Sequence, residues 1–140
     1  MTVTDQAPTP RWLLIVSIIL LLWNLMGVAS FVAHWAMTAD DVAALPAIQQ
    51  DMMNEMSART WISFAVATGA GLLGGLALLI KRKWAAPLFA ISFVAILTQF
   101  TSPHLLDIAV NRDATIMAFP AFIAAMALVQ CLLSWHCTKR

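Results

Sequence analysis

Residues 12–35 read WLLIVSIILLLWNLMGVASFVAHW, and this stretch decides the fold. Its 24 residues include no Asp, Glu, Lys or Arg. As an α-helix the stretch would rise about 36 Å, which is enough to cross a hydrocarbon core of about 30 Å with some tilt. It is therefore predicted to be a membrane-spanning helix.

Three more apolar stretches follow, at about residues 61–80, 84–102 and 114–135. Polar loops separate them at residues 36–60 and about 103–114, and the basic triplet Lys81-Arg82-Lys83 marks a turn between the second and the third. Pro120 lies about two turns into the last stretch, so we expect a kink there. The pattern predicts four spans.

The composition agrees with a membrane protein. Of the 140 residues, 61% are hydrophobic and 11% are charged. Ordinary soluble domains are about 45–50% apolar and about 25% charged. We predict an all-α, integral membrane four-helix bundle that forms a single domain over residues 12–137, with a polar tail at residues 1–11 and a short end at residues 138–140.

The basic residues predict the orientation, because Lys and Arg concentrate on the cytoplasmic side of membrane proteins. With four spans, Arg59 and Arg112 fall on one side of the membrane. The other six fall on the side of both chain ends: Arg11, Lys81, Arg82, Lys83, Lys139 and Arg140. The predicted bundle is therefore antiparallel, with both termini in the cytoplasm.

A second interpretation of the first stretch stays open. Residues 12–29 would then be a cleaved signal peptide, with Gly27-Val28-Ala29 as a small-residue cleavage site. We favour a retained helix, because the apolar stretch continues past this site to Trp35 and Arg11 alone supplies the positive region.

The outer loop at residues 36–60 contains a helical pattern. Ile48, Met52 and Met56 recur four apart, which places them on one face of a short amphipathic helix. Thr38 and Asp41 have the spacing of a capping box. The helix would either form a lid over the outer mouth of the bundle or rest on the other helices, and we favour the second interpretation.

Five of the polar side chains within the predicted spans are candidates for a functional or a packing role. Polar groups in hydrocarbon are costly, so they usually face the interior of a bundle. These residues are Asn24, His34, Ser92, Gln99 and Gln130. They would form either a polar track for a substrate, a quinone or a proton, or hydrogen bonds between helices worth about 0.6–2 kcal/mol each. We favour the hydrogen bonds.

The second stretch carries a glycine face. Gly71 and Gly75 form a GxxxG motif beside Gly74, which allows another helix to approach closely. Ala121 and Ala125 in the fourth stretch are a candidate partner surface. We favour packing within the chain over dimerisation of two copies.

Signals for cofactors and catalysis are weak. His34 and His104 are expected at similar depth near the outer surface, where two histidines could ligate a haem iron, but neither belongs to a haem motif. No soluble-enzyme motif or metal-ligand spacing occurs. The net charge of +1 gives no case for nucleic acid. We predict a protein that is not an enzyme and has no cofactor and no metal.

Several short motifs occur together in order. They are Trp23-Asn24-x-x-Gly27, Met37-Thr38, Leu45-Pro46, the glycine-rich stretch, Lys81-Arg82-Lys83-Trp84-Ala85 and Gln99. Over about residues 12–104 this layout resembles a group of small bacterial inner-membrane proteins of unknown function, some of which carry an automatic sugar-transporter label. The DoxX-like four-helix proteins are similar in size and architecture only. The resemblance implies a multi-pass protein of the bacterial inner (plasma) membrane.

These observations favour a non-enzymatic accessory protein that assembles through helix contacts, either with itself or with a membrane-protein partner in the lipid bilayer. The alternative is an oligomeric transporter or channel for small solutes, although a single bundle of this size is expected to have little room for a cavity. A membrane redox component that binds haem or quinone is the third hypothesis.

Overall fold

The computed structural model describes residues 10–80 and 83–139, and this part of the chain is helical without any strand. The elements are α1 (Arg11–Trp35), α2 (Ala39–Ala43), α3 (Ala47–Asn54), α4 (Ala58–Leu79), α5 (Ala85–Phe100), α6 (Pro103–Asn111), the 3₁₀ helix η1 (Ala114–Met117) and α7 (Ala118–Thr138). The all-α prediction is confirmed. Most of the predicted N-terminal tail, and Lys81, Arg82 and Arg140 of the orientation argument, lie outside the described residues.

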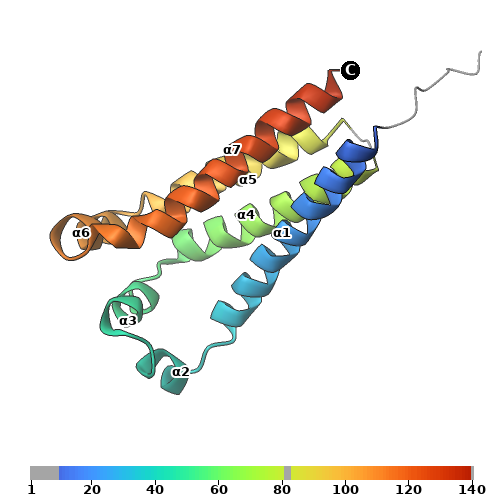
Figure 1. Cartoon of the computed structure of the whole chain (residues 1–140). Coiled ribbons are helices and arrows are strands. Elements are labelled where there is room, and N and C mark those ends of the chain that lie inside the picture. The colour runs from blue at the N-terminus through green and yellow to red at the C-terminus, as the bar shows by residue number, and fades with distance from the viewer. Residues whose placement is uncertain (1–9, 81–82, 140) are drawn as a thin grey trace, which may run out of the picture.

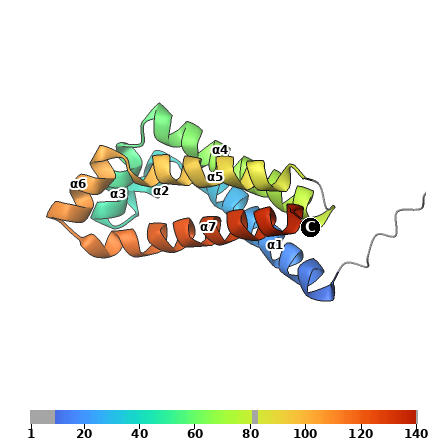
Figure 2. The same ribbon diagram turned by 90° about the horizontal axis from the view of Figure 1, so that it is seen from above.

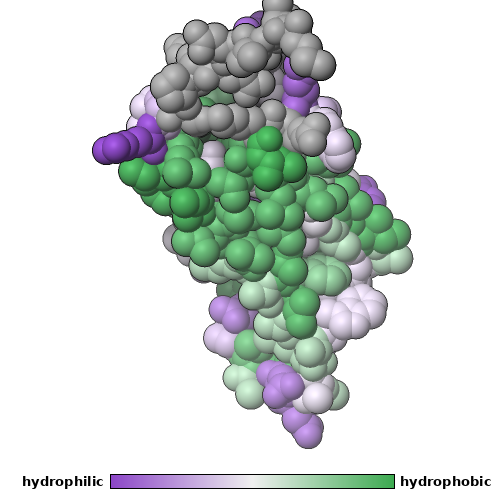
Figure 3. Space-filling model, turned by 90° about the vertical axis from the view of Figure 1, so that its right-hand side faces the viewer, coloured by the Kyte–Doolittle hydropathy of each residue, from purple (hydrophilic) through white to green (hydrophobic). Residues whose placement is uncertain are grey.

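Three segments are each long and apolar enough to cross a membrane: α1, α4 and the continuous stretch Ala114–Thr138. A fourth crossing is reached if α5 and α6, which are bent by 56° at the break between them, count as one span. Large apolar side chains are exposed on the outer surface, among them Leu22 at 60% and Leu132 at 62%. Hydrophobic side chains cover the middle of the face shown in Figure 3. This surface fits lipid, because soluble monomers rarely expose such large apolar areas.

The third predicted span differs from the observed one. Helix α5 has only 16 residues, and the predicted polar loop at about 103–114 contains helix α6. Pro103 disfavours helical geometry at Ser102, whose ψ is 138°. The Ser102 hydroxyl then accepts a hydrogen bond from the Leu105 N–H (3.4 Å) and caps the new helix. The break follows from this Ser-Pro pair.

The expected kink at Pro120 is replaced by a change of helix type. Residues 114–117 form the 3₁₀ helix η1, and α7 begins at Ala118. Pro120 therefore lies in the first turn of an α-helix, where the missing N–H has no intrahelical partner to lose.

The outer loop contains two short helices, α2 and α3. Thr38 and Asp41 form the predicted capping box at α2: the Thr38 hydroxyl accepts from the Asp41 N–H (3.2 Å), and the Thr38 N–H donates to the Asp41 carboxylate (2.8 Å). The backbone and hydroxyl hydrogen bonds from Thr38 lower the pKa of Asp41. A short helix, α3, forms where the amphipathic helix was predicted and carries Ile48 and Met52, but it ends at Asn54, so Met56 lies outside it.

Helix α4 packs against both α1 and α5, and α5 also packs against α7. The start of α1 and the end of α7 lie at the same end of the molecule, which we call the termini end; α2, α3 and α6 lie at the opposite end, the loop end (Figure 1). The axis of α1 is inclined to that of α7 (Figure 2).

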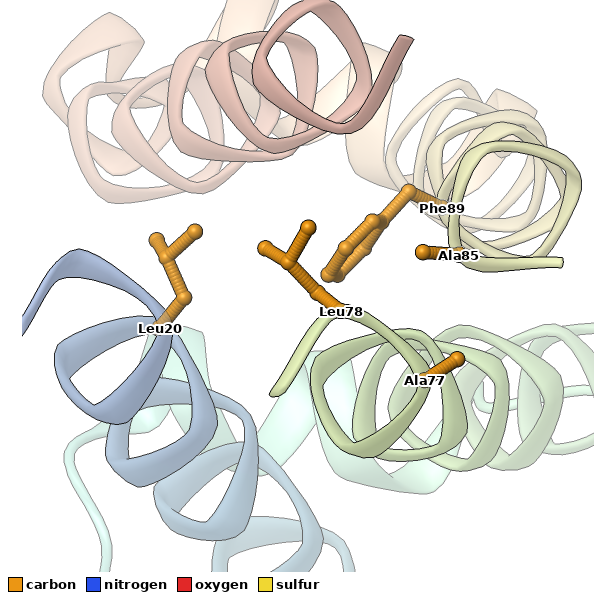
Figure 4. Close-up of a cluster of buried hydrophobic side chains, with 5 residues drawn as sticks. All are labelled: Leu20, Ala77, Leu78, Ala85 and Phe89. Carbon is orange, nitrogen blue, oxygen red and sulfur yellow. The ribbon is translucent and has the colours of Figure 1, made fainter. Parts of the chain in front are cut away.

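The half of the molecule near the termini end has a packed apolar core. Leu20 from α1, Leu78 from α4 and Phe89 from α5 point toward one another, with Ala77 and Ala85 beside them (Figure 4). Phe89 is only 2% exposed. Small residues on α4 and α5 let these helices approach closely and leave room for the three large side chains.

The glycine face of α4 packs inside the chain. A Cβ at Gly74 would lie 3.0–3.2 Å from the Phe89 ring of α5, and one at Gly75 would lie 3.3 Å from a Leu21 methyl of α1. The predicted partner surface on α7 is not used in this way, because Ala121 and Ala125 are exposed. Helix α4 packs against α5 rather than against α7.

Candidate binding cavity

Polar side chains from three helices meet near the middle of the molecule. Asn24 of α1, Ser92 of α5 and Gln130 of α7 are 8%, 5% and 3% exposed. The Asn24 Nδ2 donates to the Leu20 carbonyl (2.7 Å) and to the Gln130 Oε1 (2.9 Å). We call Asn24, Ser92 and Gln130 the central polar cluster. It joins the first and the last long helix, which also meet through an edge-to-face pair of Trp23 and Phe122.

Helix α4 contributes space and a carbonyl to this cluster. A Cβ at Gly71 would lie 2.2 Å from the Asn24 Oδ1 and 3.2 Å from the Ser92 Oγ. The Ser92 hydroxyl donates to the Ala67 carbonyl, one turn earlier on α4, at 2.7 Å. Gly71 is therefore the position that lets both polar side chains reach the backbone of α4.

A cavity of about 1130 Å³ lies between the central polar cluster and the loop helices. Its walls are mostly apolar. They include five methionines (Met26, Met37, Met52, Met53 and Met56) and five aromatic residues (Trp23, Phe64, Phe89, Phe100 and Phe119). The expectation that a bundle of this size has little room for a cavity is wrong, because the helices are filled with side chains only in the half near the termini end.

Helix α3 covers the loop end of this cavity. Ile48 and Met52 on one face of α3, and Met56 just after its end, line the interior. The ion pair of Asp51 with Arg112 holds α3 to the end of α6, and both of these side chains are more than 40% exposed. Because an exposed ion pair contributes only about 0–1 kcal/mol, this attachment is weak. Helix α3 contacts α6, as in the favoured interpretation of the loop, and it also lines the loop end of the cavity.

The charged side chains that line the described cavity are acidic. Glu55 at the end of α3 and Asp113 before η1 belong to the lining, and no Lys or Arg of the described residues does. Hydrogen bonds from the Thr115 hydroxyl (2.6 Å) and the Thr115 N–H (2.9 Å) lower the pKa of Asp113. The carboxylate of Asp113 is therefore ionised at neutral pH.

All five predicted intramembrane polar residues line this one cavity. His34 and Gln99 lie nearer the loop end than the cluster, and Gln99 makes no hydrogen bond within the described chain. The His34 Nδ1 donates to the Ser30 carbonyl (2.7 Å). Neither the pairing of Asn24 with Gln130 nor the gathering of five of the eight methionines at this cavity was predicted from the sequence, because no local pattern marks either of them.

The two candidate haem ligands both line the cavity but are not paired. His34 packs edge-to-face on Phe64, with ring centroids 5.9 Å apart. His104 on α6 has a buried Nε2 without a hydrogen-bond partner. Within residues 10–80 and 83–139, no group of three metal-ligating His, Cys, Asp or Glu side chains occurs. Nothing in this geometry favours haem over the other uses of the cavity.

Comparison of the chain with protein-family models, with curated proteins and with solved structures found no match. The resemblance to small bacterial inner-membrane proteins thus stays a prediction.

We predict that Gly71→Ala destabilises the fold by about 1–3 kcal/mol, because the new methyl group collides with the Asn24 amide in a filled site. Gly69→Ala in the same helix is the matched control. A Cβ at position 69 would meet nothing within 4 Å. This variant should therefore gain up to about 1 kcal/mol of stability, because alanine has a higher helix propensity than glycine. Thermal or chemical unfolding in detergent measures both, and equal stability of the two variants would contradict this packing.

We also predict a coupling of about 0.6–1.7 kcal/mol between Asn24 and Gln130, the range for hydrogen bonds between membrane helices. A double-mutant cycle of Asn24→Ala, Gln130→Ala and the double variant measures it in the same unfolding assay. Strictly additive effects would show that the observed 2.9 Å contact does not stabilise the fold.

Proposed function

We propose that the protein binds a mostly apolar small molecule inside the membrane. The single observation that carries this proposal is the cavity of about 1130 Å³, with mostly apolar walls and the central polar cluster in its lining. Ligand sites typically measure about 300–1,000 Å³ and combine apolar walls with a few polar groups that fix orientation. A lipophilic compound dissolved in the bilayer is the natural occupant.

The proposal includes a membrane placement. The four spans are α1, α4, the bent pair α5 and α6, and the stretch Ala114–Thr138. They form an antiparallel bundle in a bacterial inner membrane, with the termini end in the cytoplasm, because six of the eight basic residues belong to that side. The loop end and the cover formed by α3 then lie on the outer side.

Contacts within the chain favour ligand binding over assembly through the glycine face and over conduction. Assembly through Gly71 and Gly75 would need α1 to move aside, because these residues face Asn24 and Leu21 of the same chain. An interaction protein that uses other surfaces stays a prediction. The packed core at the termini end favours binding over conduction, since a channel would need an open path past Leu20, Leu78 and Phe89.

The placement predicts the accessibility of single cysteines in a chain that carries Cys131→Ser and Cys137→Ser. We expect Asn54→Cys at the loop end to react with a membrane-impermeant maleimide in spheroplasts. We expect Lys83→Cys at the termini end to react only after the membrane is disrupted. The reverse pattern would overturn the orientation.

The binding proposal predicts saturable photolabelling in native membranes by a neutral alkyl probe that carries a diazirine. Labelled peptides are expected from the cavity walls, including α3. Ile123→Trp fills part of the cavity and should weaken labelling roughly tenfold, equivalent to about 1.4 kcal/mol of lost binding.

Leu128→Trp is the matched control, since Leu128 lies on the same helix α7 but is 44% exposed on the outer surface. Labelling of the Leu128→Trp variant should equal that of the unaltered protein. Melting curves verify that both tryptophan variants fold. Labelling that does not saturate, or that falls equally in both variants, would remove the proposal.

A further inference from the structure

We infer that the end of the ligand that meets the central polar cluster is an uncharged hydrogen-bond acceptor, a carbonyl or hydroxyl oxygen. This inference rests on the proposed function and names its ligand class. Two observations carry it: one amide nitrogen in the cluster without an acceptor, and the charges around the cavity.

The hydrogen bonds fix which atom of each amide is nitrogen. The Leu20 carbonyl can only accept, so the Asn24 atom 2.7 Å from it is Nδ2. The second proton of this nitrogen points to Gln130, so the Gln130 atom 2.9 Å away is the oxygen Oε1. The remaining Gln130 atom is therefore Nε2, a donor of two protons.

The Gln130 Nε2 has no acceptor among the described residues. Gln130 is 3% exposed and lines the cavity. The only unpartnered polar side-chain atom that is fully buried in the described chain is the His104 Nε2, so the Gln130 Nε2 keeps access to the cavity. A donor left unpaired in an apolar site is costly, and a ligand oxygen removes this cost.

Ser92 adds a selective feature to the cluster. Its hydroxyl proton is used on the Ala67 carbonyl, so its oxygen can only accept further hydrogen bonds. A ketone or quinone carbonyl would accept from Gln130 alone. A hydroxyl group would accept from Gln130 and donate to Ser92. Both kinds of head group satisfy the cluster without carrying charge.

The charges around the cavity disfavour ligands with an ionised head group at the central polar cluster. An ionised group near the middle of a bilayer is costly, and the described lining has no Lys or Arg to pair with a carboxylate or phosphate. Its two imidazoles, His34 and His104, lie nearer the loop end, away from Gln130. Glu55 and Asp113 would repel such anions further. An ammonium head would be drawn to these two acids at the loop end, away from Gln130. Fatty acids and anionic lipids are therefore the wrong class.

The test is competition against the neutral diazirine probe by amphiphiles that share one alkyl chain and differ in the head group. We expect the methyl ketone and the primary alcohol to compete at concentrations about tenfold or more below those of the carboxylate and the alkylammonium ion. The plain alkane should need roughly 2–10 times more than the ketone, the range for one net hydrogen bond.

Gln130→Met removes the Nε2 donor and keeps the length of the side chain, and its thioether sulfur is a weak acceptor for the Asn24 Nδ2 proton that the Gln130 Oε1 accepts in the unaltered protein. The advantage of the ketone over the alkane should therefore vanish. Gln99→Met is the matched control, because Gln99 also lines the cavity and lies outside the cluster. If the ketone keeps its advantage in Gln130→Met, or loses it in Gln99→Met, the assignment to Gln130 is overturned.

A measurement on the unaltered protein keeps the inference testable if Gln130→Met does not fold. The infrared stretch of a carbon-13-labelled ketone carbonyl should move to lower frequency when it is bound than in a liquid alkane. An unshifted band, or a carboxylate that competes as well as the ketone, would overturn the inference while the binding proposal stands. Absence of saturable labelling by the probe would instead remove the binding proposal itself.

Discussion

The hydrogen bond from Asn24 to Gln130 is the constraint on which the rest of the structure depends. Between membrane helices there is no hydrophobic driving force, because lipid chains are as apolar as leucine. The contacts that define how the helices sit are therefore directional hydrogen bonds and close approaches of the backbone. Asn24 supplies both, since its amide bonds to α7 while its oxygen fills the space that Gly71 leaves on α4. One side chain thereby sets the positions of the first, second and last spans.

The distribution of residue size explains why one half is filled and the other is hollow. Near the termini end, Gly74, Gly75 and Ala85 bring α1, α4 and α5 together around Phe89. Beyond the central polar cluster, the short helices α3 and α6 cover the space between the long helices without filling it. The break at Ser102 and Pro103 places α6 over this space.

The positions of the helices along the chain can be predicted from the sequence. Which side of each helix faces its neighbours cannot, because it depends on how the helix is rotated about its axis. Uninterrupted apolar stretches marked the spans, and the spacing of Ile48, Met52 and Met56 predicted α3, because both signals are local. The partner of Asn24 was not predictable, since Gln130 is 106 positions away and both helices are apolar on every side. For the same reason Ala121 and Ala125 looked like a packing face but are exposed. The break after α5 was readable from Ser102-Pro103, although the apolar residues around it suggested a longer span.

The cavity itself argues against a purely structural role for the polar residues. Protein interiors are packed about as densely as organic crystals, with few voids larger than a water molecule. If the central polar cluster served only to hold the helices, Gln130 would need no free donor, and side chains would be expected to fill the volume above it. Instead, flexible methionines line that volume, and methionine adapts to occupants of different shape. In the proposed function, an apolar molecule in the cavity contacts these side chains, and a neutral oxygen on that molecule accepts from the Gln130 Nε2. Ligand binding and the stability of the fold are then coupled through Gln130.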